Sequence, residues 1–184
     1  MTNPSSICVY CASAIDVAQP YRDAAVQLGR TLGEHGIDTV YGGGRNGLMG
    51  LVADAALAAG GRVVGIIPQS IAALEVGHLT LSELVTVETM HQRKLMMAER
   101  ADGFVVLPGG LGTLDETLEM LAWKQLGLHD KPIVILNIAG YWDPLLAMLA
   151  RAVDENFIYE RHRALYRAVS DVADVLPAIV ADLR

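Results

Sequence analysis

Apolar residues follow two different patterns along the chain. Short continuous apolar runs are typical of strands buried on both faces, whereas apolar residues recurring every three or four positions are typical of helices. The continuous runs predict strands at residues 7–10, 38–41, 62–67, 84–87, 103–107, 132–136 and 166–169. The spaced patterns predict helices at residues 21–35, 47–59, 90–100, 113–126 and 141–154, and from residue 171 onward.

The order of these elements predicts the fold class. Strand and helix alternate throughout, which favours a three-layer α/β fold whose mostly parallel sheet of roughly seven strands is covered by helices on both faces. In such sheets ligands bind beyond the carboxyl ends of the strands. Residues 68–83 form the longest irregular stretch, with room for one short helical turn, and such stretches often carry function.

Composition narrows the class of protein. With 184 residues, 52% apolar and 19% charged, the chain is long and apolar enough for one globular domain spanning residues 1–184. No apolar run reaches the roughly 18 residues of a membrane helix, and no basic region precedes an apolar run at the N-terminus, so we expect a cytoplasmic protein. The net charge of −7 argues against nucleic-acid binding but leaves room for one bound phosphate.

The two cysteines, Cys8 and Cys11, have C-x-x-C spacing but fall in or beside a predicted strand. Their side chains should then lie on opposite faces of the sheet, which favours buried core cysteines. Zinc would need a second pair of ligands, which the sequence lacks, and the histidines show no metal-binding spacing. We therefore expect no metal site.

The first of two glycine loops, Gly42 to Gly47, formally matches G-x-G-x-x-G. A dinucleotide site usually places this motif after the first strand, with an acidic residue about 20 positions later. Here the motif follows the second strand, and residues 62–67 contain no carboxylate, so NAD is not expected. The loop is either a tight strand-to-helix turn or an anion cradle.

The second glycine loop, Pro108 to Thr113, follows the most apolar strand and opens a helix. Free N–H groups and the helix dipole favour an anion at this position. We expect Thr113 to cap the helix and to donate its hydroxyl to a phosphate. No Gly-Lys-Ser/Thr follows, which argues against a P-loop ATPase.

Three acidic residues, Asp115, Glu116 and Glu119, follow this loop. They could simply complement the helix dipole. A phosphate bound at the same helix end would repel them, however, unless one carboxylate faces a part of the ligand that becomes positive. Cleavage of a glycosidic bond creates such a part, because the sugar develops oxocarbenium character.

A basic pair, Arg93 and Lys94, lies in the predicted helix at residues 90–100. Arg93 shares a helical face with Met90 and Met97, and a charge on an apolar face is costly unless it is paired. The alternative places both cations on a solvated face. Glu75, in the irregular stretch, is by itself typical of an exposed loop residue.

Together these motifs resemble the Lonely Guy family of cytokinin riboside 5′-monophosphate phosphoribohydrolases. The resemblance rests on Gly42-Gly43-Gly44 with Gly47-Leu48-Met49-Gly50, on Met90-His91-Gln92-Arg93-Lys94, and on Pro108-Gly109-Gly110-x-Gly112-Thr113-x-x-Glu116, and it extends from Cys11 to Asn137. Members of this family were often labelled lysine decarboxylases, but no lysine here stands in an evident pyridoxal phosphate context.

The resemblance implies a Rossmann-like fold, a homodimer, and hydrolysis of N6-modified AMP to free base and ribose 5-phosphate without a cofactor. It implies that Arg93 and Glu116 are the catalytic pair. The positions that match the family's substrate-binding residues are Ser13, Gly43, Glu75, Arg93, Lys94, Gly109, Gly110, Leu111, Gly112, Thr113, Leu114 and Asp115.

Three positions depart from the family pattern. Ala12 stands where glycine is common, the segment from Ala72 to Glu75 lacks the usual Pro or Arg, and Ala122 stands where threonine is common. The last two bear on base selectivity. Two other functions stay open, a general AMP nucleosidase and a non-catalytic nucleotide or cofactor carrier, the latter needing the glycine loops but neither Arg93 nor Glu116.

Overall fold

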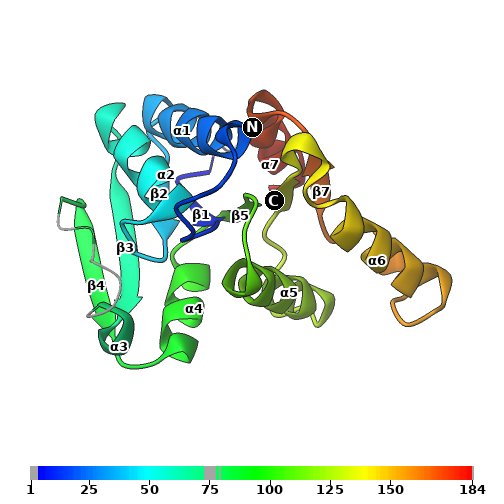
Figure 1. Ribbon diagram of the computed structural model, residues 1–184. Coiled ribbons are helices and arrows are strands. Elements are labelled where there is room, and N and C mark those ends of the chain that lie inside the picture. Colours follow the sequence, from blue (N-terminus) through cyan, green and yellow to red (C-terminus); the bar gives the residue numbers. More distant parts are fainter. Residues whose placement is uncertain (1–3, 73–77, 79, 184) are drawn as a thin grey trace.

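The computed structural model describes residues 4–72, 78 and 80–183, and its centre is one parallel sheet (Figure 1). Seven strands lie in the order β4-β3-β2-β1-β5-β6-β7, and every pair of neighbours is parallel. The strands are β1 (Ser6–Tyr10), β2 (Asp38–Tyr41), β3 (Val63–Pro68), β4 (Glu83–Val87), β5 (Gly103–Val106), β6 (Ile133–Leu136) and β7 (Arg167–Val169). The predicted strands are confirmed to within one or two residues at each end.

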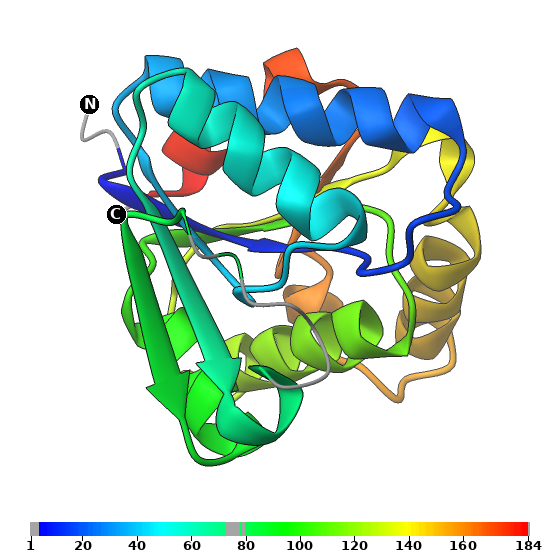
Figure 2. The ribbon, with the colours of Figure 1, turned by 60° about the vertical axis from the view of Figure 1, so that its left-hand side comes forward.

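Helices cover both faces of this sheet (Figure 2). One face carries α1 (Gln19–Glu34), α2 (Gly47–Ala58) and α7 (Val175–Asp182), and the other carries α4 (Met90–Glu99), α5 (Leu111–Gln125) and α6 (Asp143–Asp154). A single helical turn, α3 (Gln69–Ala72), follows β3. The expected three-layer α/β fold is therefore confirmed. No helix in the described part of the chain is long and apolar enough to cross a membrane.

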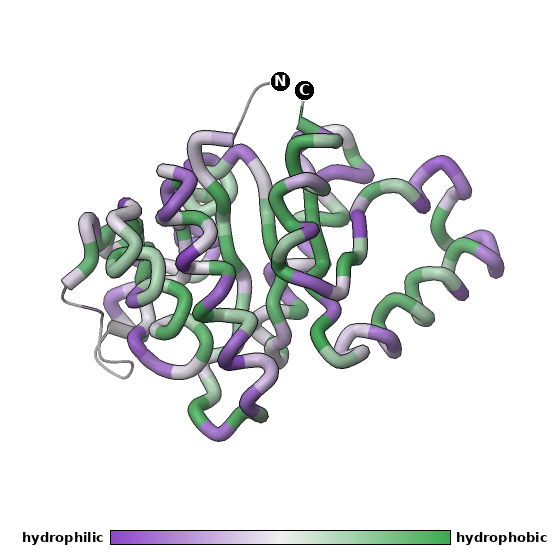
Figure 3. The backbone as a smooth tube through the Cα atoms, turned by 90° about the horizontal axis from the view of Figure 1, so that it is seen from above, coloured by the Kyte–Doolittle hydropathy of each residue, from purple (hydrophilic) through white to green (hydrophobic). Residues whose placement is uncertain are grey.

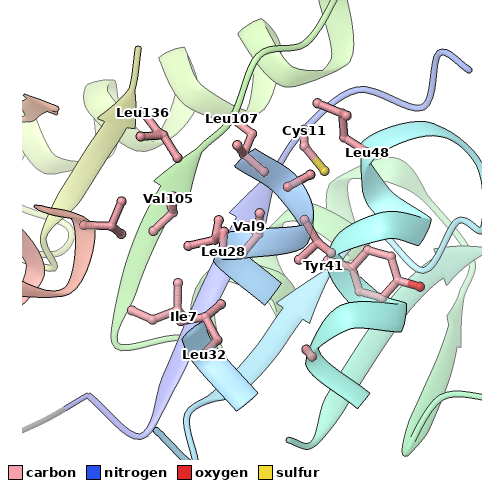
Figure 4. Packing of buried hydrophobic residues seen from close by; sticks show 14 of the residues in the cluster. Ile7, Val9, Cys11, Leu28, Leu32, Tyr41, Leu48, Val105, Leu107 and Leu136 are labelled. Atoms are coloured by element: carbon pink, nitrogen blue, oxygen red, sulfur yellow. The ribbon is translucent and has the colours of Figure 1, made fainter. Parts of the chain in front are cut away.

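The apolar core lies in two layers because successive residues of each strand point to opposite faces. Ile7 and Val9 of β1 pack with Leu28 and Leu32 of α1 on one face (Figure 4). Tyr10 belongs to the layer on the other face, where Met97 of α4 and Met120 of α5 are buried. In α6, a run of apolar residues from Leu145 to Ala150 lies between polar residues toward the two ends of the helix (Figure 3).

The two cysteines occupy different layers, as their spacing in the strand predicts. Cys8 packs on the α4 and α5 face, and Cys11 packs on the α1 and α2 face. Both thiols are free and buried, and burial raises the pKa of each well above its ordinary value. Both therefore remain protonated thiols at neutral pH.

The start of α5 corrects one expectation. The helix begins at Leu111 with Gly110 at the N-cap, so Thr113 is the third helical residue and does not cap the helix. Leu111 and Gly112 already belong to the first helical turn, because the glycines on both sides of Leu111 leave the backbone free to adopt helical angles there. The helix expected from Tyr141, by contrast, begins later than predicted, at Asp143, with Pro144 in its first turn.

The strand order defines where a ligand site should lie. Connections from β1 to β4 run toward one edge of the sheet, and those from β5 to β7 run toward the other. The order reverses between β1 and β5, where Tyr10 and Val106 are partners in register. The loops after these two strands therefore diverge and leave a crevice at the carboxyl end of the sheet, the usual ligand position in this architecture.

Candidate active site

Backbone hydrogen bonds at Ala12 join three loops at this crevice. The Ala12 N–H donates to the carbonyl of Pro108 at 3.2 Å, which ties the loop after β1 to the loop after β5. The Ala12 carbonyl accepts the N–H of Leu48 at 2.9 Å, which ties the same loop to the start of α2. Gly47 is needed here, since a Cβ at this position would overlap the backbone of Ser13 and Ala14 and its φ is +61°.

A cavity of about 340 Å³ opens between these loops and the helix α4. Its polar lining includes Ser13, Arg93, Thr113 and Glu116. Its apolar lining includes Met49, Ile71, Met90 and Leu111. The remaining described residues of the lining are Val9, Cys11, Ala12, Ala14, Gly42, Gly110 and Gly112.

Arg93 extends from α4 across the floor of the cavity. Its Nη2 donates to the carbonyl of Gly42 at 3.3 Å, and its Nη1 lies 3.7 Å from the sulfur of Met90. The residue is 9% exposed, and its Nε is buried without a hydrogen-bond partner in the described part of the chain. The apolar-face interpretation of Arg93 is thus the correct one, and the solvated-face alternative is wrong.

Glu116 of α5 faces Arg93 from the opposite side. Its Oε1 lies 3.8 Å from Nη2 of Arg93, and the residue is 7% exposed. Burial raises the pKa of Glu116 to about 7, although the positive charge of Arg93 lowers it. A carboxyl group with a pKa near neutrality can both accept and release a proton at physiological pH.

Lys94 lies beside this pair but binds other partners. Its Nζ contacts Asp115 at 3.0 Å and Glu119 at 3.1 Å, both on α5. These hydrogen bonds to the two carboxylates raise the pKa of Lys94 despite its partial burial. Lys94 therefore fastens α4 to α5 next to the catalytic candidates, and it is not among the described residues that line the cavity.

The first turn of α5 borders the cavity. A helix leaves its first N–H groups without intrahelical partners, and these groups favour an anion. A Cβ at Gly110 or Gly112 would meet no atom within 4 Å, so space for a ligand is present beside both glycines. Thr113 is buried, and its side chain packs so closely on Gly109 that a Cβ at Gly109 would overlap it.

The first glycine loop forms a close-packed turn. A Cβ at Gly42 would overlap the guanidinium of Arg93, and Gly43 has a φ of +76°. The Gly43 carbonyl accepts the N–H of His78 at 3.3 Å, and the buried His78 ring contacts Asp54 of α2 at 2.8 Å. These contacts fit a tight turn, and they do not exclude an anion cradle, because Gly42 also lines the cavity.

The structure brings together part of the predicted site. Ser13, Arg93, Thr113 and Glu116 line the cavity together with Gly110, Leu111 and Gly112. Among the described residues, those predicted to bind substrate but lying outside the cavity lining are Gly43, Lys94, Gly109, Leu114 and Asp115. Glu75 lies outside the described residues.

The apolar part of the cavity lining could not be predicted from the sequence. Met49, Ile71 and Met90 lie on three separate segments, and nothing in their spacing connects them. Only Met90 had a usable signal, because it shares a helical face with Arg93 at an offset of three.

Fold and site together define a Rossmann-like α/β protein with a ligand cavity at its topological switch point. A family model described as "Possible lysine decarboxylase" matches residues 49–179. The chain is 47% identical over 170 residues to a probable cytokinin riboside 5′-monophosphate phosphoribohydrolase of Oryza sativa subsp. japonica, covering 92% of this chain and 75% of the relative. A cytokinin riboside 5′-monophosphate phosphoribohydrolase of Arabidopsis thaliana is 45% identical, with 92% and 80% covered.

The chain belongs to this phosphoribohydrolase family, the Lonely Guy family. Among solved structures, a structural genomics target is 28% identical with a TM-score of 0.73, covering 96% of this chain and 99% of that one. The molybdenum cofactor carrier protein of Chlamydomonas reinhardtii is 21% identical with a TM-score of 0.76 and 99% of each chain covered, which shows a shared fold.

The older family description finds no support in the lysines. Lys94 binds two carboxylates, Lys124 donates to the carbonyl of Lys131, and Lys131 donates to the carbonyl of Ala98. A lysine that forms a Schiff base must project into the ligand site with a free amine. None of the three is among the described residues lining the cavity.

Proposed function

We propose that this protein hydrolyses the N-glycosidic bond of N6-modified adenosine 5′-monophosphates to the free base and ribose 5-phosphate. The observation that carries the proposal is the buried pair of Glu116 and Arg93, placed one helical turn from the glycine loop of α5. The first turn of α5 would hold the 5′-phosphate, and Ser13 and Thr113, which also line the cavity, would donate their hydroxyls to it. The curated relatives at 45–47% identity carry this activity in their names.

In the proposed reaction, the bond between C1′ of the ribose and N9 of the base breaks, and its electron pair stays on the base. The ribose carbon becomes positive, and the carboxylate of Glu116 stabilises that charge. Water then adds its oxygen to C1′ and loses a proton to Glu116, and this proton finally neutralises the departed base anion. Arg93 orients Glu116 and the ligand and favours departure of the negatively charged base.

The apolar side chains of the cavity lining would contact the base. Met49, Ile71, Met90 and Leu111 offer flexible or branched apolar side chains for this contact. Such a surface suits an adenine ring bearing an apolar N6 group better than it suits a polar substituent.

The test is a substrate panel. The protein is incubated with isopentenyladenosine monophosphate, AMP and the corresponding nucleosides, and free base is followed by chromatography. We expect release from the monophosphates and little from the nucleosides, with the prenylated base preferred. Preference for plain AMP would indicate a general AMP nucleosidase, tight binding without turnover would indicate a carrier, and base release that survives in Glu116→Gln would reject the assigned role.

We also propose a homodimer formed through the α5 and α6 side of the molecule. Only Val153 of α6 is buried, while Leu118 and Leu126 at α5 and Met148 of α6 are exposed together with Phe157. A large exposed apolar surface of this kind is typical of an interface. Light scattering should give twice the mass of one chain, and Leu118→Glu with Met148→Glu should give the monomer.

A further inference from the structure

Tyr141 holds the backbone of the glycine loop from outside it. Its hydroxyl donates a hydrogen bond of 2.7 Å to the carbonyl of Gly109. Gly109 lies between β5 and α5, whereas Tyr141 lies in the corner after β6, 32 positions further along the chain. The proposed reaction assigns no task to this side chain.

Every carbonyl at the start of this loop is bonded within the protein. The carbonyl of Pro108 accepts the N–H of Ala12, that of Gly109 accepts the Tyr141 hydroxyl, and that of Gly110 accepts the N–H of Leu114 at 3.0 Å. A carbonyl oxygen turned into the cavity would repel a phosphate. The C=O and N–H of a trans peptide point in opposite directions, so fixing the Gly109 carbonyl also fixes the direction of the Gly110 N–H.

Sterics alone would leave this peptide free to turn. A Cβ at Gly110 would meet no atom within 4 Å, and glycines on both sides of the peptide permit a wide range of backbone angles. Of the three carbonyls, that of Gly109 is the one held by a side chain rather than by the backbone. Its orientation therefore depends on a hydrogen bond that one substitution can remove.

The turn after β6 determines the direction in which the Tyr141 side chain points. Ala139 has a φ of +51° and Gly140 one of +72°, which turns the chain sharply before α6. The Asn137 side chain closes this turn, because it accepts the N–H of Trp142 and donates to Asp143, each at 2.7 Å. A non-glycine residue in the left-handed region is uncommon and marks a position where the surroundings impose the conformation.

Aromatic packing fixes the ring of Tyr141 in turn. Its ring lies edge-on to Tyr21 of α1, with 5.6 Å between centroids, and edge-on to Trp142, with 4.8 Å. The contacts with Tyr21 and Trp142 therefore fix the ring in the orientation in which its hydroxyl reaches the Gly109 carbonyl.

We propose that Tyr141 is a positioning residue for the phosphate: it holds the peptide between Gly109 and Gly110 so that the Gly110 N–H faces the bound anion. This inference rests on the proposed function, since it requires a 5′-phosphate at the first turn of α5. Tyr141 itself is not among the described residues that line the cavity.

The experiment compares Tyr141→Phe with the wild-type protein by calorimetric titration of ribose 5-phosphate and of adenosine. Loss of the hydroxyl should weaken ribose 5-phosphate binding about tenfold and leave adenosine binding within about twofold. In turnover, KM for the monophosphate should rise while kcat at saturation stays within about twofold. Tyr21→Phe is the matched control, because it removes a neighbouring phenol hydroxyl and keeps the edge-on ring contact.

The outcomes separate the two proposals. An unchanged affinity of Tyr141→Phe for ribose 5-phosphate, or an equal loss for ribose 5-phosphate and adenosine, would overturn the positioning role. Wild-type protein that binds ribose 5-phosphate but releases no base would reject the hydrolysis, and the same affinity ratio would still decide the role of Tyr141. Wild-type protein that binds no ribose 5-phosphate would overturn both.

Discussion

The guanidinium of Arg93 and the carboxyl of Glu116 face each other across 3.8 Å, with their side chains only 11% and 9% exposed. This separation exceeds a hydrogen-bond length, so each group keeps donors or acceptors for a ligand or a water molecule. The attraction is nevertheless strong, because the surroundings are poorly solvated. The pair therefore combines mutual charge stabilisation with free hydrogen-bonding capacity.

Removing the cation should impair catalysis more than folding. We expect Arg93→Met to lower kcat about 100-fold, since Glu116 loses the charge that lowers its pKa and the base loses a stabilising group. Arg93→Lys should retain part of the activity, because it restores the charge but not the planar fork. Base release at saturating substrate measures both variants, and an Arg93→Met enzyme within threefold of the wild type would contradict the pairing.

The raised pKa of Glu116 predicts a pH-dependent stability. The pKa is about 7 in the folded protein and 4.5 without perturbation, so the folded state holds the proton more tightly. The resulting stabilisation is fully present below pH 4.5 and is lost as the pH rises through 7. Its size is at most about 3 kcal/mol.

Urea denaturation of the wild type and of Glu116→Gln between pH 4.5 and 8 measures this pH-dependent contribution of Glu116 to stability. The free energy of unfolding of the wild type should fall relative to the variant as the pH rises, because glutamine does not titrate. Parallel curves for the two proteins would show that Glu116 keeps an ordinary pKa. The kcat/KM of the wild type should rise over the same range, since the carboxylate form is the active one.

Gly42 should be required for activity through Arg93. A Cβ at Gly42 would overlap the Arg93 guanidinium, the mobile end of a long side chain, so we expect the arginine to move rather than the fold to fail. Gly42→Ala should lower kcat about tenfold while the melting temperature changes little. In an Arg93→Met background the same substitution should have almost no further effect, and independent losses would exclude this explanation.

The sequence pattern was sufficient to predict the fold because the central strands β1, β3, β5 and β6 are almost continuously apolar and the helices have regularly spaced apolar residues. The turn of residues 42–47 was left with two interpretations, since glycine is suited equally to close packing and to anion binding. The close packing depends on Arg93, His78 and the loop after β1, which are distant in sequence and could not be predicted from it. Thr113 was misplaced as a cap because helix boundaries are set by backbone geometry that glycines leave undetermined.

Substitution of Lys94 tests whether this residue contacts the substrate or only links α4 to α5. The resemblance to the family implies contact with the nucleotide, whereas in the structure Nζ binds Asp115 and Glu119 at 3.0 and 3.1 Å. We expect Lys94→Met to lower the free energy of unfolding by about 1 kcal/mol, as loss of a partly buried charge network does. KM for the monophosphate should stay within about twofold.

The same substitution should also shift the pH dependence of activity. Lys94 lowers the pKa of Glu116, while Asp115 and Glu119 raise it. Lys94→Met should therefore move the rise of kcat/KM to higher pH, and adding Asp115→Asn and Glu119→Gln should move it back, because the opposing charges are then gone too. A tenfold increase of KM in Lys94→Met would instead indicate direct contact between Lys94 and the substrate if it persists in the variant that also carries Asp115→Asn and Glu119→Gln. In that variant no neighbouring carboxylate remains through which the loss of the lysine could act.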